Sequence, residues 1–405
     1  MYQIKNCRSC NSKKLSKIIS IGKQYLSDFR SDKRKPKKFP LDLIVCKDCR
    51  LVQLRHNAPS SLLYSERYGY KSGINQTMKK ELKEIVEKSI DSVGKKGNLT
   101  VVDIGANDGT LISFYPKKYF KVAVEPIKKL AKEAKTFSNK VVNDFFNHES
   151  FIKTVGKNKK ADIITAISCF YDMEDPNKFV ADVKKIMVDD GIFVIQQNYL
   201  LEMLNQNAFD NIVHEHLEYY SLLSLENLLD KFDLEVFDLE LSNINGGSFR
   251  TYICKKGVKP VTNAVKNQRA LEKKYKLETM EVYKDFSNRV KNNAKNLYKF
   301  IKEKTKEGKT FYLYGASTRG NTLLQYFKLD SKLIKAAVER NPEKWGKYIS
   351  SVTIPIISEE QARKDKPDYM VVLPWFFKEE FLQRENKYLE SGGHLIFPLP
   401  KFEII

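Results

Sequence analysis

The 405-residue sequence predicts an α/β protein with a small N-terminal module, a doubly wound α/β domain, a helical spacer and a second α/β domain. Three observations predict this order. Two Cys-x-x-Cys pairs lie near the start, two strand–glycine–helix segments (101–112 and 310–320) each begin an alternation of strands and helices, and residues 260–307 are rich in Lys and Glu and lack glycine. A chain of this length needs more than one hydrophobic core. Alternating strands and helices favour parallel sheets with helices on both faces.

Charge and composition narrow the classes of partner without deciding among them. Lys and Arg number 71 against 50 Asp and Glu, and the formal net charge of +21 favours anionic partners. The lysines are scattered over almost every segment, which is more typical of a solvated surface than of a nucleic-acid footprint. No apolar run approaches the roughly 20 residues that cross a bilayer, and the start, MYQIKNCRSC, lacks the apolar core of a signal peptide. We therefore expect a cytoplasmic protein without a membrane partner.

Four of the six cysteines form two Cys-x-x-Cys pairs, Cys7 with Cys10 and Cys46 with Cys49. Four thiolates match a tetrahedral structural zinc site, which leaves no position for a catalytic water. Disulfides are disfavoured in a reducing compartment. A thioredoxin-like motif would require a pair beside a βαβ unit, and neither pair has one. The sequence therefore predicts a zinc-binding module at the N-terminus.

The segment VVDIGANDGTLI (101–112) predicts a ligand crevice in the first α/β domain. A buried strand ends at Asp103, and the turn that follows contains Gly105 and Gly109. Glycine permits a tight turn and lets a ligand approach the backbone N–H groups. Glu125 ends the next predicted strand, where a carboxylate can accept both hydroxyls of a ribose.

The chemistry of this turn favours S-adenosylmethionine (SAM) over a dinucleotide. The dinucleotide fingerprint fails, because Asn107 and Thr110 stand where its second and third glycines would be. Asp108 makes the turn acidic, which suits a cofactor that carries a sulfonium and an amino group but no phosphate. After the third strand, Asp144 and Phe145 are candidates to bind the adenine amino group and cover the ring, although Phe145 is equally compatible with a core position.

A histidine pair in FDNIVHEHLEYYS (209–221) is the candidate for proton transfer. His214 and His216 flank Glu215, a spacing that differs from the helical i, i+4 pair of zinc proteases. A histidine with a pKa near neutrality, oriented by an adjacent carboxylate, is suited to act as a general base. DNA and RNA amino-methylases carry a Pro-Pro-aromatic motif after the fourth strand, but this chain has ISCFYDMEDP (167–176) there.

Several further segments, in the same order along the chain, resemble one family over nearly the whole sequence. They are CRSC with PLDLIVCKDCRLVQL, ERYGYKSG, VVDIGANDGTLI, FDNIVHEHLEYYSL, NINGGSFRTYI, YGASTRGNTLL, ERNPEKWGKYISSVTIPI and GGHLIFPLP. The chain resembles the SAM-dependent sugar C-methyltransferases of deoxysugar biosynthesis, of the type that methylates C-3 of nucleotide-linked 4-keto sugars. The resemblance implies a zinc-binding domain, a class I methyltransferase domain and a C-terminal Rossmann-like domain, with SAM and zinc as cofactors and a sugar nucleotide as substrate.

The resemblance also implies roles for particular residues. His216 would be the base that forms an enediolate, with Glu215 beside it, and Tyr68 or Tyr70 would contact the keto oxygen. The remaining residues would face the substrate, with the last three at a helix N-terminus that receives the nucleotide phosphate: His214, Asn198, Ser317, Thr318 and Arg319.

Three departures from the family pattern leave the acceptor open. Val213 stands where many members have tyrosine, Asp172 where they tend to have histidine, and QQNY (196–199) replaces an acidic-proline segment. An O-methyltransferase acting on a sugar or sugar-phosphate hydroxyl is therefore an alternative, and a zinc-containing RNA-binding protein is a third. The sequence is compatible with a monomer. The expected domains are a zinc-binding module (1–75), a SAM-binding domain (76–258), a helical spacer (259–308) and a substrate-binding domain (309–405).

Overall fold

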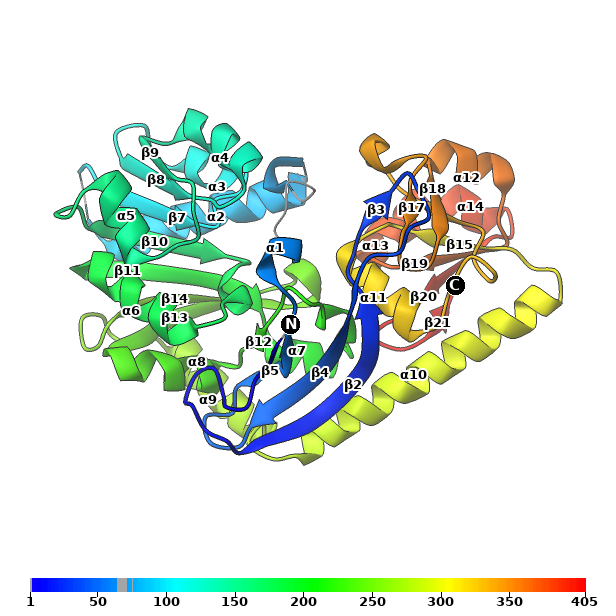
Figure 1. Ribbon diagram of the computed structural model, residues 1–405, viewed down its shortest axis with the longest axis horizontal. Coiled ribbons are helices and arrows are strands. Elements are labelled where there is room, and N and C mark those ends of the chain that lie inside the picture. Colours follow the sequence, from blue (N-terminus) through cyan, green and yellow to red (C-terminus); the bar gives the residue numbers. More distant parts are fainter. Residues whose placement is uncertain (1, 64–70, 75, 96) are drawn as a thin grey trace.

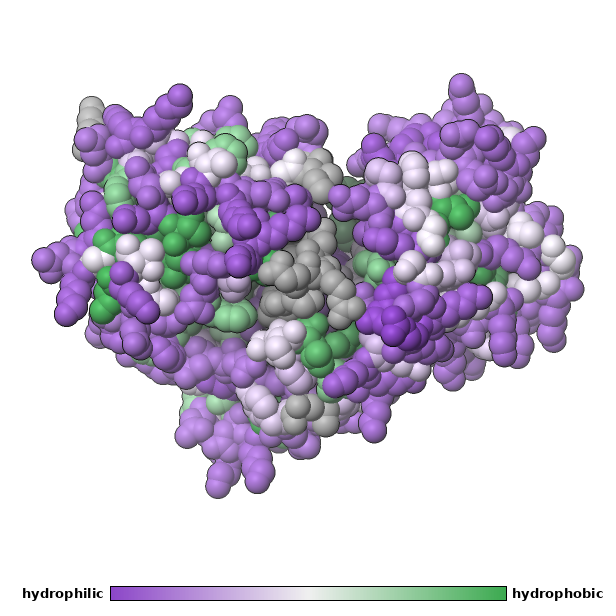
Figure 2. Space-filling model, turned by 45° about the horizontal axis from the view of Figure 1, so that its top comes forward, coloured by the Kyte–Doolittle hydropathy of each residue, from purple (hydrophilic) through white to green (hydrophobic). Residues whose placement is uncertain are grey.

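The computed structural model describes residues 2–63, 71–74, 76–95 and 97–405. Two α/β lobes lie side by side, and the N-terminal strands together with one long helix run beneath both (Figure 1). We call the α/β unit within residues 76–258 the first lobe and that within 310–405 the second lobe. The face shown in Figure 2 is largely hydrophilic, with apolar residues scattered among polar ones. Among the described helices, none is both long and apolar enough to cross a membrane.

The first lobe is a seven-stranded sheet in the order β13-β14-β11-β10-β7-β8-β9, in which β14 runs antiparallel to both of its neighbours. Its strands are β7 (Thr100–Ile104), β8 (Phe120–Val124), β9 (Lys140–Val142), β10 (Ala161–Ile167), β11 (Met187–Asn198), β13 (Leu234–Ser242) and β14 (Ser248–Lys255). Its helices are α2 (Gln76–Val93), α3 (Thr110–Phe114), α4 (Lys128–Ala134), α5 (His148–Val155), α6 (Pro176–Ile186), α7 (Leu200–Asn205) and α8 (Leu222–Leu229). The strand order reverses between β7 and β10, which is where ligands bind in doubly wound sheets.

The second lobe is a smaller sheet of the same kind. Five parallel strands have the order β18-β16-β15-β19-β20, and antiparallel strands flank them. The strands are β15 (Phe311–Tyr314), β16 (Ala336–Val338), β17 (Tyr348–Ile349), β18 (Ile354–Ile357), β19 (Tyr369–Val372), β20 (His394–Phe397) and β21 (Glu403–Ile404). The helices are α11 (Thr318–Tyr326), α12 (Glu359–Asp365), α13 (Lys378–Arg384) and α14 (Asn386–Glu390).

The N-terminal module is a hairpin that contacts both lobes. Its strands are β1 (Tyr2–Gln3), β2 (Leu15–Tyr25), β3 (Phe29–Arg30), β4 (Lys38–Cys46), β5 (Val52–Leu54) and β6 (His56–Asn57), followed by α1 (Ser60–Leu63). At one end β5 pairs with β12 (Glu218–Tyr219) of the first lobe. At the other end β3 pairs with β17 and so joins the sheet of the second lobe. The module therefore spans the two lobes.

Burial explains why these residues form these elements. All five residues of β7 are buried, as expected for a parallel strand covered by helices on both faces. In the spacer, α9 (Asn263–Lys274) packs against β13 and α8, while α10 (Glu281–Lys306) buries residues at three-to-four spacing: Tyr283, Phe286, Val290, Leu297 and Ile301. The predicted fold class is confirmed, and the domain limits given above stay predictions.

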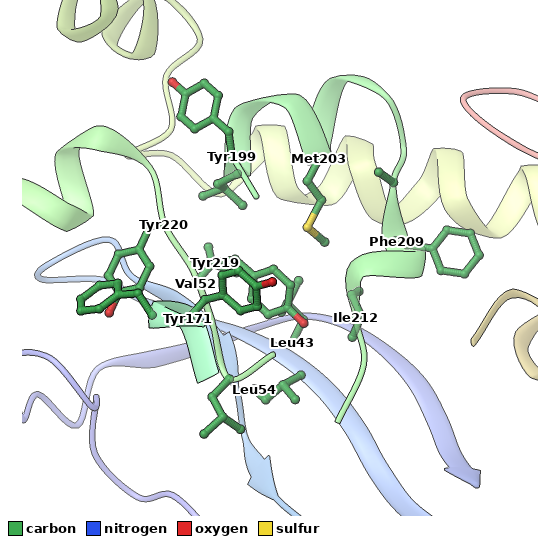
Figure 3. Close-up of a cluster of buried hydrophobic side chains, with 14 of the residues drawn as sticks. Leu43, Val52, Leu54, Tyr171, Tyr199, Met203, Phe209, Ile212, Tyr219 and Tyr220 are labelled. Atoms are coloured by element: carbon green, nitrogen blue, oxygen red, sulfur yellow. The ribbon is translucent and has the colours of Figure 1, made fainter. Parts of the chain in front are cut away.

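A shared core fixes the histidine-pair segment on the N-terminal module. Buried apolar side chains of β4 and β5 meet those of residues 199–220 (Figure 3). The contributing residues include Leu43, Val52, Leu54, Phe209, Ile212 and Tyr219. The segment is therefore held by packing on the module as well as by its own lobe.

Candidate active site

The four predicted zinc ligands lie together at the end of the hairpin. Their sulfur atoms lie within 4.8 Å of one another, and Cys7 to Cys49 and Cys10 to Cys46 are both 3.5 Å between sulfurs. Zn–S bonds of about 2.3 Å in a tetrahedron place sulfurs roughly 3.8 Å apart, so the cluster fits Zn²⁺. Asn11 donates its N–H to the Cys7 carbonyl across one knuckle, and Arg50 donates to Cys46 across the other. Both have φ near 60°, so the two turns have matching geometry.

The cluster is attached to the first lobe, which indicates a structural role. The Asn177 amide donates to the carbonyl of Arg8 at 2.7 Å, and the Asn227 amide donates to the carbonyl of Cys49 at 3.1 Å. Each knuckle is therefore held by a helix or turn of the first lobe. With four thiolates around the ion, no coordination position is left for a substrate.

A cavity of about 360 Å³ opens at the carboxyl ends of β7, β8 and β10. This is the switch point of the sheet, where the turns after these strands meet. Three residues of the N-terminal module, Ala58, Ser60 and Leu63, also line it. We call this cavity the crevice. The family resemblance implies that the zinc-binding module roofs the substrate cleft, whereas nothing local in residues 58–63 indicates a ligand.

Two buried carboxylates form the floor of the crevice. Asp103 is 3% exposed and accepts a hydrogen bond from the Thr165 hydroxyl at 2.6 Å. Burial raises the pKa of Asp103 to about 7. Glu125 accepts the backbone N–H of Asn107 at 2.9 Å and of Ile127 at 2.8 Å, and burial raises its pKa. A carboxylate has about four lone pairs, so Glu125 can still accept ribose hydroxyls.

The crevice as a whole is acidic. Five carboxylate side chains line it: Asp103, Glu125, Asp172, Glu174 and Glu215. Burial also raises the pKa of Glu215, so the ionised form is destabilised until a positive group is nearby. A ligand with a sulfonium and an ammonium group supplies that positive charge. The donor set therefore fits SAM.

Gly105 and Phe145 border the ligand space. Gly105 has φ 74°, and a Cβ there would lie 3.0 Å from the sulfur of Cys169, so the turn depends on glycine. Phe145 lines the crevice with 51% of its surface exposed, as expected for a ring that covers a ligand. Asp144 lies outside the crevice lining, and its carboxylate accepts the N–H of Phe145 at 2.8 Å. Its predicted contact with adenine has no support in this arrangement.

Two residues of the predicted cofactor-binding turn, Asp108 and Gly109, make contacts that stabilise the fold. Asp108 accepts the N–H of Gly73 at 2.9 Å and the hydroxyl of Thr110 at 2.6 Å, which holds the 71–74 segment on the start of α3. At Gly109, a Cβ would lie 2.7 Å from the Cα of Ala134, so this glycine permits close packing of α4. The acidity of the crevice comes from the strand ends and the opposite wall, and the carboxylate of Asp108 is used elsewhere.

The first histidine of the pair anchors its segment. His214 is 5% exposed, and its Nε2 lies 3.1 Å from the carbonyl of Phe39 on β4, to which it donates a proton. Burial lowers the pKa of His214 to about 4, so the ring stays neutral. The side chain of His214 ties the segment to the N-terminal module, and its predicted contact with substrate stays a prediction.

The second histidine is held in one tautomer. The Nδ1 of His216 lies 3.0 Å from the carbonyl of Asn211, which can only accept, so Nδ1 carries the hydrogen and Nε2 the lone pair. The ring of Tyr171 packs edge-on at 4.5 Å. Burial, and then the charge of Arg319, lowers the pKa of His216 to about 3, which keeps the imidazole neutral. Glu215 and Leu217, which flank His216, line the crevice, and His216 itself is not among the lining residues.

Two of the second-lobe residues predicted to bind phosphate, Ser317 and Arg319, make contacts within the protein. Ser317 caps α11 and accepts the N–H of Gly320 at 3.0 Å, directly before Thr318 begins the helix. Arg319 pairs with the buried Asp210, with Nε at 2.9 Å and one terminal nitrogen at 2.8 Å from the same carboxylate oxygen. The charge of Arg319 faces a carboxylate of the first lobe, and its predicted role as a phosphate donor stays a prediction.

Asn198 is predicted to bind the substrate, and its side chain has a hydrogen-bond acceptor that no described residue satisfies. It ends β11, and its side-chain oxygen is buried without a hydrogen-bond partner among the residues that the structure describes. A buried amide oxygen of this kind is satisfied by a ligand or water. The candidates for the keto oxygen, Tyr68 and Tyr70, lie outside the described residues.

The comparisons with known proteins cover almost the whole chain. Family models match in this order: a putative zinc binding domain at residues 7–64, a methyltransferase domain at 70–239 and a C-methyltransferase C-terminal domain at 243–400. The C-methyltransferase NovU of Streptomyces niveus is 28% identical over 408 residues, which cover 99% of this chain and 97% of NovU.

Solved structures of methyltransferases match part of the chain. A SAM-dependent methyltransferase from Clostridium acetobutylicum is 14% identical, covering 44% of this chain and 92% of its own, with a TM-score of 0.35. The plantazolicin methyltransferase BpumL in complex with SAH is 12% identical, covering 43% of this chain and 82% of its own, with a TM-score of 0.35. These likenesses concern the fold alone, and nothing about the site rests on them.

The fold, the crevice and the matched domains define a SAM-dependent methyltransferase that also binds zinc. More particularly, the chain is a three-domain protein in which a zinc-binding domain, a methyltransferase domain and a C-methyltransferase C-terminal domain follow one another.

Proposed function

We propose that this protein transfers the methyl group of SAM to a carbon atom of a nucleotide-linked keto sugar, with His216 as the base. The observation that carries the proposal is the fixed tautomer of His216, whose Nδ1 faces the Asn211 carbonyl at 3.0 Å. Nε2 thereby keeps its lone pair, and the flanking residues Glu215 and Leu217 line the acidic crevice. The similarity to NovU, a C-methyltransferase, over almost the whole chain supports carbon as the acceptor.

Different residues of this chain would carry out the separate steps of the proposed reaction. Nε2 of His216 takes a proton from the carbon beside the keto group, the C–H electron pair moves into the adjacent C–C bond, and the carbonyl electrons move to the oxygen. The resulting enediolate needs a donor at that oxygen. Tyr68 and Tyr70 stay the predicted donors, and Asn198 stays the predicted contact for a sugar hydroxyl. When bound, SAM supplies an electrophilic methyl group for the carbon.

The crevice favours this reaction electrostatically. Asp103, Glu125 and Glu215 hold the cationic cofactor at the carboxyl ends of the strands. Burial and the nearby Arg319 keep the imidazole of His216 unprotonated at neutral pH. The base is therefore unprotonated before substrate binds, and its basicity is lower than that of the near-neutral histidine expected from the sequence.

The test uses a panel of 4-keto sugar nucleotides, incubated with the enzyme in D₂O with and without SAM. We expect deuterium at the carbon beside the keto group without SAM, and a carbon-bound methyl group by NMR with it. His216→Asn should abolish both, while His148→Asn, on α5 outside the crevice lining, should retain both. A methyl ether as product, or exchange that persists in His216→Asn, would overturn the proposal.

A further inference from the structure

We propose that Asp210 is a positioning residue through which the second lobe sets the orientation of His216. The ion pair of Asp210 with Arg319 and its hydrogen bond from Trp375 fix the short turn whose carbonyl holds the imidazole. The inference rests on the proposed role of His216 as base. It assigns to the second lobe a part in the chemistry that is separate from any contact with substrate.

The first observation is how Asp210 is held. Its side chain is fully buried, and one carboxylate oxygen accepts hydrogen bonds from Nε of Arg319 at 2.9 Å and from the indole of Trp375 at 3.1 Å. The same oxygen forms an ion pair with a terminal nitrogen of Arg319 at 2.8 Å. Arg319 lies in the first turn of α11, after β15, and Trp375 follows β19. These are the two adjacent strands at which the second sheet reverses its order. The ends of both strands therefore converge on one carboxylate of the other lobe.

The second observation is what this carboxylate belongs to. Asp210 is the middle residue of the turn Phe209–Asn211, and the carbonyl of Asn211 accepts from Nδ1 of His216 at 3.0 Å and from the Tyr219 hydroxyl at 3.1 Å. The ring of Phe209 packs edge-on against Tyr326 of α11, with centroids 5.0 Å apart. The turn thus has α11 on one side and the imidazole on the other.

The third observation is that the adjoining residue is tied to the same helix. The hydroxyl of Thr322, one turn along α11 from Arg319, donates to the carbonyl of Ile212 at 3.4 Å. Three of four successive positions, 209, 210 and 212, therefore contact the second lobe, and the carbonyl of the fourth, Asn211, holds the base. A shift of this turn relative to α11 would move the acceptor of His216 directly.

Physical reasoning gives the consequence of breaking the link. Asp210→Asn keeps the shape of the side chain and can still accept from Trp375, but it removes the carboxylate that pairs with Arg319 in a buried place. The turn then loses its strongest constraint, and the Asn211 carbonyl is no longer fixed opposite Nδ1. Small displacements of a catalytic group reduce rates by up to about 100-fold.

The experiment compares Asp210→Asn, Arg319→Gln and the double variant with a control, Glu385→Gln. Glu385 is also a buried carboxylate of the second lobe that pairs with an arginine, but it contacts Arg363 and Tyr314 and not the base segment. The first readout is the ¹⁵N NMR spectrum of the imidazole of His216 in the SAM-bound protein without sugar. We expect the single Nδ1–H tautomer in the wild type and the control, and a mixture of tautomers in Asp210→Asn and Arg319→Gln.

The second readout separates positioning from substrate binding. With a keto-sugar nucleotide, we expect the saturating rate of deuterium exchange to fall on the order of 10–100-fold in both single variants, with KM changed by less than about threefold. The double variant should be no worse than either single one. The thermal midpoint and the Kd for SAM report whether each variant is folded.

Two results would overturn the inference. One is an unchanged His216 tautomer together with an unchanged exchange rate in a folded Asp210→Asn protein. The other is an Arg319→Gln protein whose KM rises while its saturating rate is retained, which would return Arg319 to the phosphate. Because the tautomer is measured without sugar, failure of the wild type to act on any keto sugar would refute the proposed function but leave this inference standing on its own readout.

Discussion

Each lobe contains a turn made of a strand, a glycine in the left-handed region and a helix, and among the described residues the turn of the first lobe lines the crevice while that of the second does not. Gly105 has φ 74° and Gly315 has φ 90°. Each next strand ends at a glutamate that accepts an N–H of the turn, Glu125 from Asn107 at 2.9 Å and Glu339 from Ala316 at 3.1 Å. The backbone plan is the same in both lobes.

The surroundings of the second turn account for the difference. The ammonium of Lys344 lies 2.7 Å from the carbonyl of Ala316, and a Cβ at Gly315 would lie 3.1 Å from the ring of Pro374. Where the first lobe has the buried carboxylate Asp103 two residues before its glycine, the second has the buried apolar Leu313. A strand–glycine–helix turn is thus a backbone scaffold, and the side chains around it decide whether it binds a cofactor or, as α11 does, supports another segment.

The largest expected effect comes from adding a methyl group to each glycine. Gly105→Ala must adopt a left-handed conformation that costs about 1–2 kcal/mol, and its Cβ would crowd Cys169 at 3.0 Å in the crevice. We expect SAM affinity to fall on the order of 100-fold, about 2.7 kcal/mol, as measured by calorimetric titration.

The matched variant Gly315→Ala carries the same backbone strain in the second lobe. It should lower the thermal midpoint while leaving the Kd for SAM within about twofold. If Gly315→Ala weakened SAM binding as much as Gly105→Ala, the contrast between the two turns would be wrong.

The two glutamates provide the next test. Glu125→Gln removes a charged acceptor, and such hydrogen bonds contribute about 1.5–3 kcal/mol. We therefore expect the Kd for SAM to rise about 10- to 100-fold. Glu339→Gln should reduce thermal stability alone, since Glu339 accepts from Ala316 and Asn341 within its own lobe. Equal effects of the two changes on SAM binding would contradict the assignment of Glu125 to the ribose.

The pH dependence of SAM binding tests the role of Asp103, the buried carboxylate that has no counterpart in the turn of the second lobe. The pKa of Asp103 is raised to about 7 by burial, so the folded apoprotein keeps a proton that the unfolded chain loses near pH 4. This group's contribution to stability is therefore fully present below pH 4 and is lost as pH rises to about 7. Cationic SAM favours the carboxylate, so its affinity should increase up to about tenfold from pH 6 to pH 8.

The control for that titration is Asp103→Asn, which should bind SAM more weakly and with a flat pH profile. Titrations at each pH would be made by calorimetry in buffers of different ionisation enthalpy, which also count the proton released on binding. A pH slope that survives in Asp103→Asn would assign the proton to another group of the crevice.

Local patterns made much of the fold and the crevice predictable. Each Cys-x-x-Cys pair and the segment containing Asp103, Gly105 and Glu125 combine residues that are close in sequence, or that lie at successive strand ends of one sheet. Such spacing fixes position through the backbone alone. The zinc cluster and the floor of the crevice followed directly.

Contacts between residues that lie far apart in the sequence could not be predicted from local patterns. His214 meets Phe39, and Arg319 meets Asp210, across more than one hundred residues of chain. Side chains able to bind a substrate were instead paired with groups of another domain, and no spacing in the sequence indicates such pairs. The contacts of Asp108 are local, because an aspartate two residues before a helix N-terminal hydroxyl can accept from it.

The smallest predicted effect concerns the rim of the crevice, where the first lobe carries an exposed ring. Phe145 is 51% exposed and lines the crevice, while Phe137, 45% exposed, packs near Gly109 outside the lining. Stacking on a base contributes about 1 kcal/mol or more, so Phe145→Ala should weaken SAM binding roughly fivefold and Phe137→Ala should leave it unchanged. Both changes remove a ring of similar exposure. A difference in the Kd for SAM between the two variants therefore reports contact of Phe145 with the adenine, and it excludes a general loss of exposed apolar surface as the cause. Equal Kd values for SAM in the two variants would instead make Phe145 a surface residue and confine cofactor recognition to the buried carboxylates and the glycine turn.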